Sequence, residues 1–205
     1  RTYAENKRSL PTLAGARPLT ESKEQPALGT CVYCGSRSGK NPNYTETARL
    51  LGTALGNARH PLVYGGGSVG LMGTLADAAL AAGGTVTGVI PREMVEREWA
   101  HPTLSELLVV KDMHQRKAAM AARARIFVAL PGGFGTLEEL AEILSWAQLQ
   151  FHSHPLYLIN TCGYFDALLA FLDHCVTEQF ATAAHRSLLK IVDDVEDLFT
   201  QADYT

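Results

Sequence analysis

A strand, a glycine-rich turn and a helix follow one another without a gap in the stretch Ile126-Phe127-Val128-Ala129-Leu130-Pro131-Gly132-Gly133-Phe134-Gly135-Thr136-Leu137-Glu138-Glu139. The solid apolar run predicts a buried strand, and the amphipathic pattern over 137–151 predicts a helix. Glycines without a Cβ let the backbone approach a ligand, and Thr136 can cap a helix that starts at Leu137. The N–H groups at such a helix start favour a dianion such as phosphate. The alternative, for one such loop alone, is a tight turn with a helix cap.

The same alternation of strand and helix continues through the chain from Leu28 onward. Solid apolar strands alternating with helices predict an α/β fold, namely a Rossmann-like doubly wound parallel sheet of about seven strands with helices on both faces. An eight-stranded barrel is typically longer. We expect one nucleotide-binding domain over 28–205, with its ligand at the carboxyl ends of the strands. The predicted strands are 29–33, 61–64, 85–90, 107–111, 126–130, 155–159 and 189–192, and the predicted helices are 44–57, 70–82, 115–124, 137–151, 164–179 and 195–202.

Composition narrows the class of protein. The chain has 205 residues, 46% of them hydrophobic, and a formal net charge of −3, so nothing steers it onto nucleic acid or an anionic membrane. No apolar run reaches the ~18 residues of a membrane helix. Residues 1–27 are polar and aperiodic, without the apolar core of a secretory signal, so we expect an extension or flexible tail. Four cysteines are too few for a disulfide scaffold, which favours a reducing, cytoplasmic compartment.

Two further loops leave predicted strands directly for helices. They are Cys34-Gly35-Ser36-Arg37-Ser38-Gly39 and Gly65-Gly66-Gly67-Ser68-Val69-Gly70-Leu71-Met72-Gly73. Neither is a Walker A loop, and the embedded GxGxxG lacks the acidic residue that a dinucleotide site places at the end of the next strand. A mononucleotide therefore fits better. The secondary candidates for contact with it are Gly35, Ser36, Gly66, Gly67 and Gly70.

Two charged pairs lie beside these loops. Glu138 and Glu139 fall in the first turn of the predicted helix, where only one can point back toward the loop. Acids there also complement the helix dipole, and Thr136 to Glu139 has capping-box spacing. Arg116 and Lys117 follow Asp112 at another helix start, where cations oppose the dipole, so the pattern hints at a ligand. A solvated helix end is the alternative.

These residues resemble the LONELY GUY (LOG) family of cytokinin riboside 5′-monophosphate phosphoribohydrolases, over residues 29–199. The run Asp112-Met113-His114-Gln115-Arg116-Lys117 is similar to the family's, and PGGxGTxxE is matched at every fixed position. The resemblance implies a homodimer or higher homo-oligomer, and a longer loop than usual over 94–111 bears on the base pocket. It implies catalytic roles for Arg116 and Glu139, and substrate or phosphate contacts for Glu93, Lys117, Gly132, Gly133, Phe134, Gly135, Thr136 and Ser145.

The implied reaction is hydrolysis of the base–ribose bond of a cytokinin riboside 5′-monophosphate, and of AMP, to free base and ribose 5-phosphate. Glu139 would stabilise the oxocarbenium-like state and accept a proton from water, with Arg116 beside it. No metal or organic cofactor is expected. Two alternatives stay open: a general purine nucleotide 5′-monophosphate nucleosidase, and a non-catalytic nucleotide-binding carrier. The label lysine decarboxylase, also used for this family, has no support here, because a pyridoxal enzyme needs a Schiff-base lysine in a larger cofactor cradle.

Overall fold

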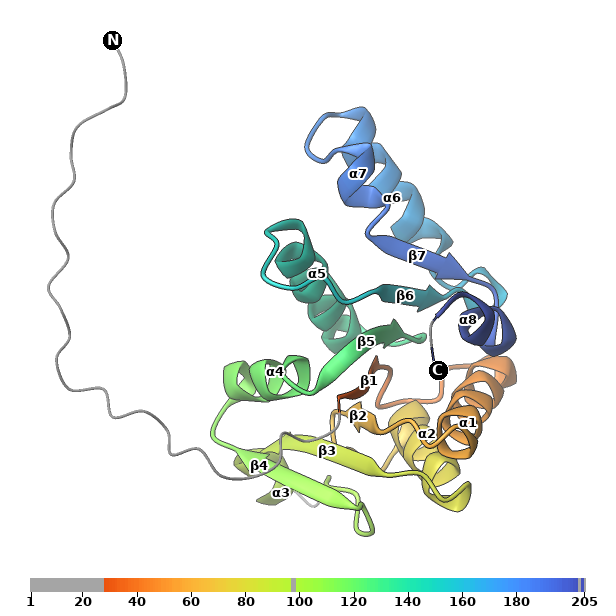
Figure 1. Ribbon diagram of the computed structural model, residues 1–205, viewed down its shortest axis with the longest axis vertical. Helices are drawn as coiled ribbons and strands as arrows, with labels where there is room; N and C mark the ends of the chain where they lie inside the picture. Colours follow the sequence, from red (N-terminus) through yellow and green to blue (C-terminus); the bar gives the residue numbers. More distant parts are fainter. Residues whose placement is uncertain (1–27, 97–98, 203, 205) are drawn as a thin grey trace, which may run out of the picture.

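A seven-stranded parallel sheet organises the computed structural model, which describes residues 28–96, 99–202 and 204 (Figure 1). The strand order is β4-β3-β2-β1-β5-β6-β7, and each neighbouring pair is parallel. After β1, the chain adds β2, β3 and β4 on one side of that strand, and it then adds β5, β6 and β7 on the other side. The strands are β1 (Gly29–Tyr33), β2 (Leu62–Tyr64), β3 (Val86–Pro91), β4 (Glu106–Val110), β5 (Ala124–Ala129), β6 (Leu156–Ile159) and β7 (Leu189–Val192).

Helices cover both faces of the sheet. The longer ones are α1 (Pro42–Asn57), α2 (Gly70–Ala81), α4 (Met113–Ala121), α5 (Phe134–Gln148), α6 (Asp166–Thr177) and α8 (Val195–Gln201). Two short helices, α3 (Arg92–Glu96) and α7 (Ala183–Arg186), and a 3-10 turn at Thr161–Gly163 complete the described elements. In Figure 1, α1, α2 and α8 lie on one side of the strands, while α4 and α5 lie on the other.

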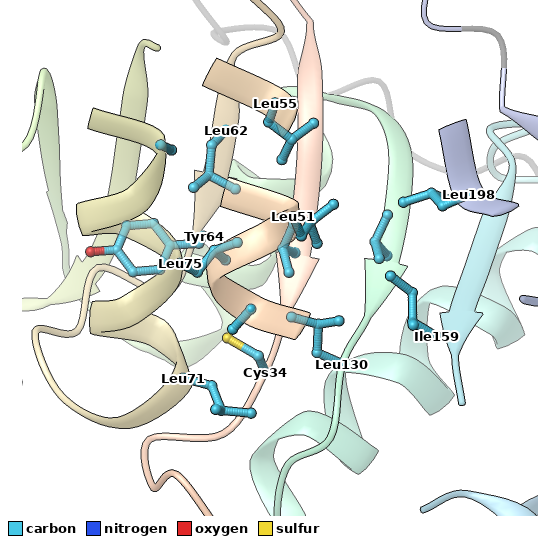
Figure 2. Packing of buried hydrophobic residues seen from close by; sticks show 14 of the residues in the cluster. Cys34, Leu51, Leu55, Leu62, Tyr64, Leu71, Leu75, Leu130, Ile159 and Leu198 are labelled. Atoms are coloured by element: carbon cyan, nitrogen blue, oxygen red, sulfur yellow. The ribbon is translucent and has the colours of Figure 1, made fainter. Parts of the chain in front are cut away.

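Two hydrophobic cores follow from the alternation of side chains along each strand. In β1, Val32 packs with α1 and α2, whereas Cys31 and Tyr33 pack with α4 and α5. Figure 2 shows part of the first core, in which Leu51 of α1 and Leu75 of α2 meet the sheet. Both faces of the central strands are buried, which explains why these strands appear in the sequence as unbroken apolar runs.

The reversal of strand order between β1 and β5 creates the switch point at which doubly wound folds bind ligands. The loops that follow these two strands are hydrogen-bonded to each other, since the Gly35 N–H donates to the Pro131 carbonyl at 3.0 Å. The Met72 N–H of α2 donates to the Gly35 carbonyl at 3.2 Å, which adds the loop after β2. Three glycine-rich loops are therefore joined at one edge of the sheet.

All seven predicted strands are confirmed within two residues at each end. The six predicted helices are confirmed within three residues at each end, and several of them are shorter than expected. The short helices α3 and α7 were not predicted. No described helix has the length and apolar character needed to cross a bilayer. The predicted tail at 1–27 lies outside the described residues.

The start of α5 corrects one prediction. The helix begins at Phe134 with Gly133 as its N-cap, whereas Thr136 was expected to cap a helix that starts at Leu137. Phe134 and Gly135 adopt helical backbone angles, so Thr136 lies inside the first turn with its side chain buried. The predicted capping box from Thr136 to Glu139 is therefore wrong, and the cap makes no side-chain hydrogen bond.

Candidate active site

A cleft of about 910 Å³ opens at the switch point, where all three glycine-rich loops meet. The loop after β1 contributes Gly35 and Ser36, and the loop after β2 contributes Gly67. The start of α5 contributes the whole predicted phosphate loop, and Arg116 and Glu139 complete this part of the wall. The structure thus brings together residues that are more than 100 positions apart in sequence. The members from the start of α5 are Gly132, Gly133, Phe134, Gly135 and Thr136.

A buried ion pair forms the centre of the cleft. Arg116, in the first turn of α4, donates from Nη1 to Oε1 of Glu139 on α5 at 3.1 Å. Its Nε donates to the carbonyl of Val89 in β3 at 3.0 Å, and its Nη2 donates to the carbonyl of Gly65 at 3.2 Å. The two side chains are 9% and 8% exposed, so the pair is not a solvated surface contact. The alternative of a solvated helix end for Arg116 is therefore wrong.

The surroundings of Glu139 hold its carboxyl near the point of ionisation at neutral pH. Burial raises the pKa of Glu139 to about 7, and the negative charges of Glu138 and Glu142 act in the same direction. Arg116 and Lys117 oppose this shift by favouring the carboxylate. A proton acceptor works best when its pKa is close to the working pH, so this environment suits a general base.

The first turn of α5 provides the features of an anion site. The first N–H groups of a helix have no intrahelical partner and lie at the positive end of its dipole. A Cβ built at Gly133 or Gly135 would meet no atom within 4 Å, so a ligand can approach the backbone there. Gly132 differs, because its Cβ would lie 2.1 Å from Oγ1 of Thr136. Phe134 is 93% exposed at the rim of the cleft.

Lys117 points away from this cleft, although it is the neighbour of Arg116 in sequence. Its ammonium donates to carboxylates of Glu138 and of Glu142, the latter at 2.9 Å. These ion pairs raise the pKa of Lys117. Lys117 is absent from the lining of the cleft, and within the described chain its role is to join α4 to α5.

Four other predicted contacts also lie off the cleft wall. Glu93 is exposed in α3, and Ser145 is exposed in the fourth turn of α5, where its hydroxyl donates to the Ala141 carbonyl of the same helix. Gly66 and Gly70 have positive φ angles of 76° and 63°, and Gly70 approaches the backbone of Ser36 so closely that a Cβ would lie 2.3 Å from it. These two glycines shape the loops rather than line the cleft.

Several lining residues were not predicted. Tyr164 follows β6, and its hydroxyl donates to the Gly132 carbonyl, while its ring packs edge-on against Tyr44 at 5.3 Å between centroids. Its place just after a predicted strand was the available clue. The other side of the cleft is apolar and sulfur-rich, and no local pattern in the sequence identifies it. Its members are Met72, Ile90, Met94, Trp99 and Met113.

The cysteines and histidines provide no second reactive centre. Cys31 and Cys34 lie in different cores on opposite sides of the sheet, and burial raises the pKa of both thiols. They are therefore ordinary buried thiols. Within residues 28–96, 99–202 and 204, no group of three or more metal-binding side chains is found.

Comparison with known proteins identifies relatives over most of the chain. A cytokinin riboside 5′-monophosphate phosphoribohydrolase of Arabidopsis thaliana is 48% identical over 173 residues, which cover 84% of this chain and 80% of the relative. The protein of that name from Rhodococcoides fascians is 46% identical over 184 residues, 89% of each chain. A probable member from Oryza sativa is 44% identical over 196 residues, 95% of this chain and 86% of the relative.

Solved structures support the fold. A molybdenum cofactor carrier protein from Chlamydomonas reinhardtii superposes with a TM-score of 0.64 at 22% identity, over 85% of this chain and 94% of that one. A molybdenum cofactor binding protein from Rippkaea orientalis has a TM-score of 0.63 at 20% identity, over 87% and 96%. At these identities the likeness shows the fold alone. The family model described as "Possible lysine decarboxylase" matches residues 72–202. Together with the relatives above, this match shows that the chain belongs to the LONELY GUY (LOG) family.

Proposed function

We propose that this protein hydrolyses the N-glycosidic bond of a cytokinin riboside 5′-monophosphate, and of AMP, to release the free base and ribose 5-phosphate. The observation that carries the proposal is the buried Arg116–Glu139 pair beside the open first turn of α5. The relatives that bear this name match more than four fifths of the chain. No described lysine lines the cleft, so the site lacks the group that would bind pyridoxal phosphate.

Three parts of the site have separate roles in the proposed reaction: the start of α5, Glu139 and Arg116. The 5′-phosphate accepts hydrogen bonds from backbone N–H groups at the start of α5 and so anchors the substrate away from the bond that breaks. Cleavage builds positive charge on the ribose, which the Glu139 carboxylate stabilises. The same carboxylate accepts a proton from the attacking water, and the departing base takes up a proton in exchange, so that neutral base and ribose 5-phosphate are released. Arg116 fixes Glu139 in place and remains protonated throughout.

The remaining predicted contacts keep secondary roles in this proposal. Gly35, Ser36 and Gly67 border the nucleotide in the cleft. Lys117 supports the charge of Glu139 through the acidic residues that it binds. The expected ligand is a small molecule, because a net charge of −3 gives no attraction to nucleic acid. We also infer a reducing, cytoplasmic compartment, since all four cysteines are free.

A second copy of the chain is the expected partner. Large apolar side chains are exposed on α5, at its carboxyl end and on α6, and an interface with a second copy would cover them. They are Leu137, Leu149, Phe151 and Phe171, with exposed fractions of 42%, 59%, 73% and 60%. Light scattering at micromolar concentration should give at least twice the chain mass of 22.2 kDa. A monomeric mass would contradict the proposed homodimer.

Substrates that differ only in the phosphate test the function directly. Two hydrogen bonds to a charged group contribute about 3 kcal/mol or more, which is roughly a hundredfold. AMP and an N6-prenylated AMP should therefore release their bases at least about a hundred times faster than the corresponding nucleosides. The assay is release of the free base, which nucleotides and nucleosides have in common, with ribose 5-phosphate measured as the second product of the nucleotides. Equal turnover of the nucleosides would contradict the phosphate site, binding without release would favour the carrier, and equal turnover of the two nucleotides would favour a general nucleosidase.

Glu139→Gln should reduce turnover by at least about a hundredfold, because an amide neither stabilises the developing cation nor accepts the proton. Nucleotide binding, measured by isothermal titration calorimetry, should change little, since the phosphate is held by the start of α5. Glu138→Gln is the matched control, because Glu138 is the neighbouring acid and lies off the cleft wall. Near-normal turnover in purified, folded Glu139→Gln would contradict the assignment.

Turnover should rise with pH as Glu139 ionises. Its pKa is raised to about 7, so kcat/KM for the free enzyme should fall as pH drops below about 7. Because a phosphate monoester also titrates near ~6, Glu142→Gln separates the two groups. Glu142 raises the pKa of Glu139, so its neutralisation should move the acid limb to lower pH. A limb near 6 in both proteins would assign the titration to the substrate instead.

A further inference from the structure

The segment that follows α3 adds one more wall to the cleft. Ala100 forms an antiparallel bridge with Gly67, and the Ser68 N–H donates to the Trp99 carbonyl at 3.2 Å. The His101 N–H donates to the Gly66 carbonyl at 2.9 Å. Residues 99–101 are thus paired to the loop after β2 by backbone contacts at three successive positions.

The side chain of His101 holds this segment against α2. The side chain is buried, and its Nδ1 accepts from the Thr103 N–H at 3.3 Å. The proton therefore lies on Nε2, which donates to Oδ1 of Asp77 on α2 at 3.0 Å. Asp77 is 72% exposed, so it anchors His101 from the surface of α2 without belonging to the core. We call this contact the His101–Asp77 clamp.

Trp99 is the large side chain that the clamped segment brings to the cleft. It lines the cleft together with Met94 and Met113, and it is 49% exposed. Indole offers a broad apolar face for stacking, and methionine thioethers adapt to irregular apolar groups. The three side chains come from three separate segments, which the fold alone brings together.

The position of this wall decides which part of a nucleotide it meets. The first turn of α5 binds the phosphate, and the Arg116–Glu139 pair contacts the ribose. The positions of these two parts of the nucleotide are therefore fixed. The base then extends toward the lining residues that remain. These residues include a polar group in the loop after β1, with Ser36, Arg37 and Ser38, and an apolar group to which Trp99, Met94 and Met113 belong. The apolar group matches an apolar substituent on a purine better than an unsubstituted amino group.

We propose that Trp99, held by the His101–Asp77 clamp, forms the base-side wall with Met94 and Met113 and sets a preference for a purine nucleotide with an apolar N6 substituent over AMP. This inference rests on the proposed function, because that function places the phosphate and the ribose. Trp99 contacts the base and determines specificity, while His101 and Asp77 act through Trp99 as positioning residues.

Trp99→Ala tests the wall. The measurement is the ratio of kcat/KM for an N6-prenylated AMP to kcat/KM for AMP, from ribose 5-phosphate release. One methylene group in an apolar pocket changes such ratios by about tenfold or more, so loss of the indole should lower the ratio at least about tenfold. Leu50→Ala, which removes another exposed apolar side chain but lies outside the cleft, should leave the ratio unchanged.

A binding measurement separates failure of the wall from failure of the reaction. Isothermal titration calorimetry of the inactive Glu139→Gln variant, with and without Trp99→Ala, gives the same preference as a ratio of Kd values. If wild type released no ribose 5-phosphate, the proposed function would fail, yet the Kd ratio would still test Trp99. A wild-type ratio near one, or a ratio unchanged by Trp99→Ala, would overturn the inference.

The clamp is tested with Asp77, which can be changed without opening the core. Asp77→Ala removes the acceptor for His101, whereas Asp77→Asn keeps an oxygen there. Asp77→Ala should lower the preference ratio with little change in kcat for AMP, and Asp77→Asn should restore it. In a Trp146→Phe background, acrylamide should quench Trp99 more strongly after Asp77→Ala. A wild-type ratio and wild-type quenching in Asp77→Ala would overturn the role of the clamp.

Discussion

Burial of one guanidinium group at the edge of the sheet is the constraint on which the rest of the site depends. Arg116 donates to the carbonyls of Val89 and Gly65 and to the carboxylate of Glu139, so a single side chain connects α4, β3, the loop after β2 and α5. A buried cation is tolerated only when it is paired and hydrogen-bonded. The pairing therefore positions the reactive carboxylate and satisfies Arg116 at the same time.

The glycines around this centre serve two different purposes. A Cβ at Gly65 would lie 1.9 Å from Nη2 of Arg116, so this glycine is required for the guanidinium to reach its place. Gly132 makes room for the side chain of Thr136 in the same way. Gly133 and Gly135 have open space where a Cβ would lie, which leaves the backbone N–H groups accessible. Close packing and ligand access thus account for different glycines of one short motif.

Adjacent charged residues take separate roles because neighbours on a helix point about 100° apart. Arg116 and Glu139 face the cleft, while Lys117 and Glu138 pair with each other outside it, where Glu142 joins them. The outer group still acts on the inner one through its charges. Glu138 and Glu142 raise the pKa of Glu139 and Lys117 lowers it, so the ionisation of the reactive carboxyl is balanced from outside the cleft.

The sequence by itself determined the layers of the fold and the members of the central motif. Apolar runs of strand length marked the inner strands, because strands buried on both faces must be apolar throughout. The edge strands β4 and β7 are only partly buried, and shorter apolar stretches marked them. The start of α5 was misplaced from sequence, because Phe134 and Gly135 continue the helix backward to Gly133 and a local pattern does not show this. The first residue of a helix is set by its backbone angles, and many residue types can adopt these angles, so the residue type alone does not locate the start.

Only the tertiary structure decided which residues meet. The packing of α4 and α5 on one face of the sheet places Arg116 against Glu139 and Lys117 against Glu138, although the sequence pattern predicted a substrate contact for both cations. The bridge between Gly67 and Ala100 brings Trp99 to the cleft. These contacts span more than 20 positions and arise from packing across the sheet, which the order of residues along the chain does not specify.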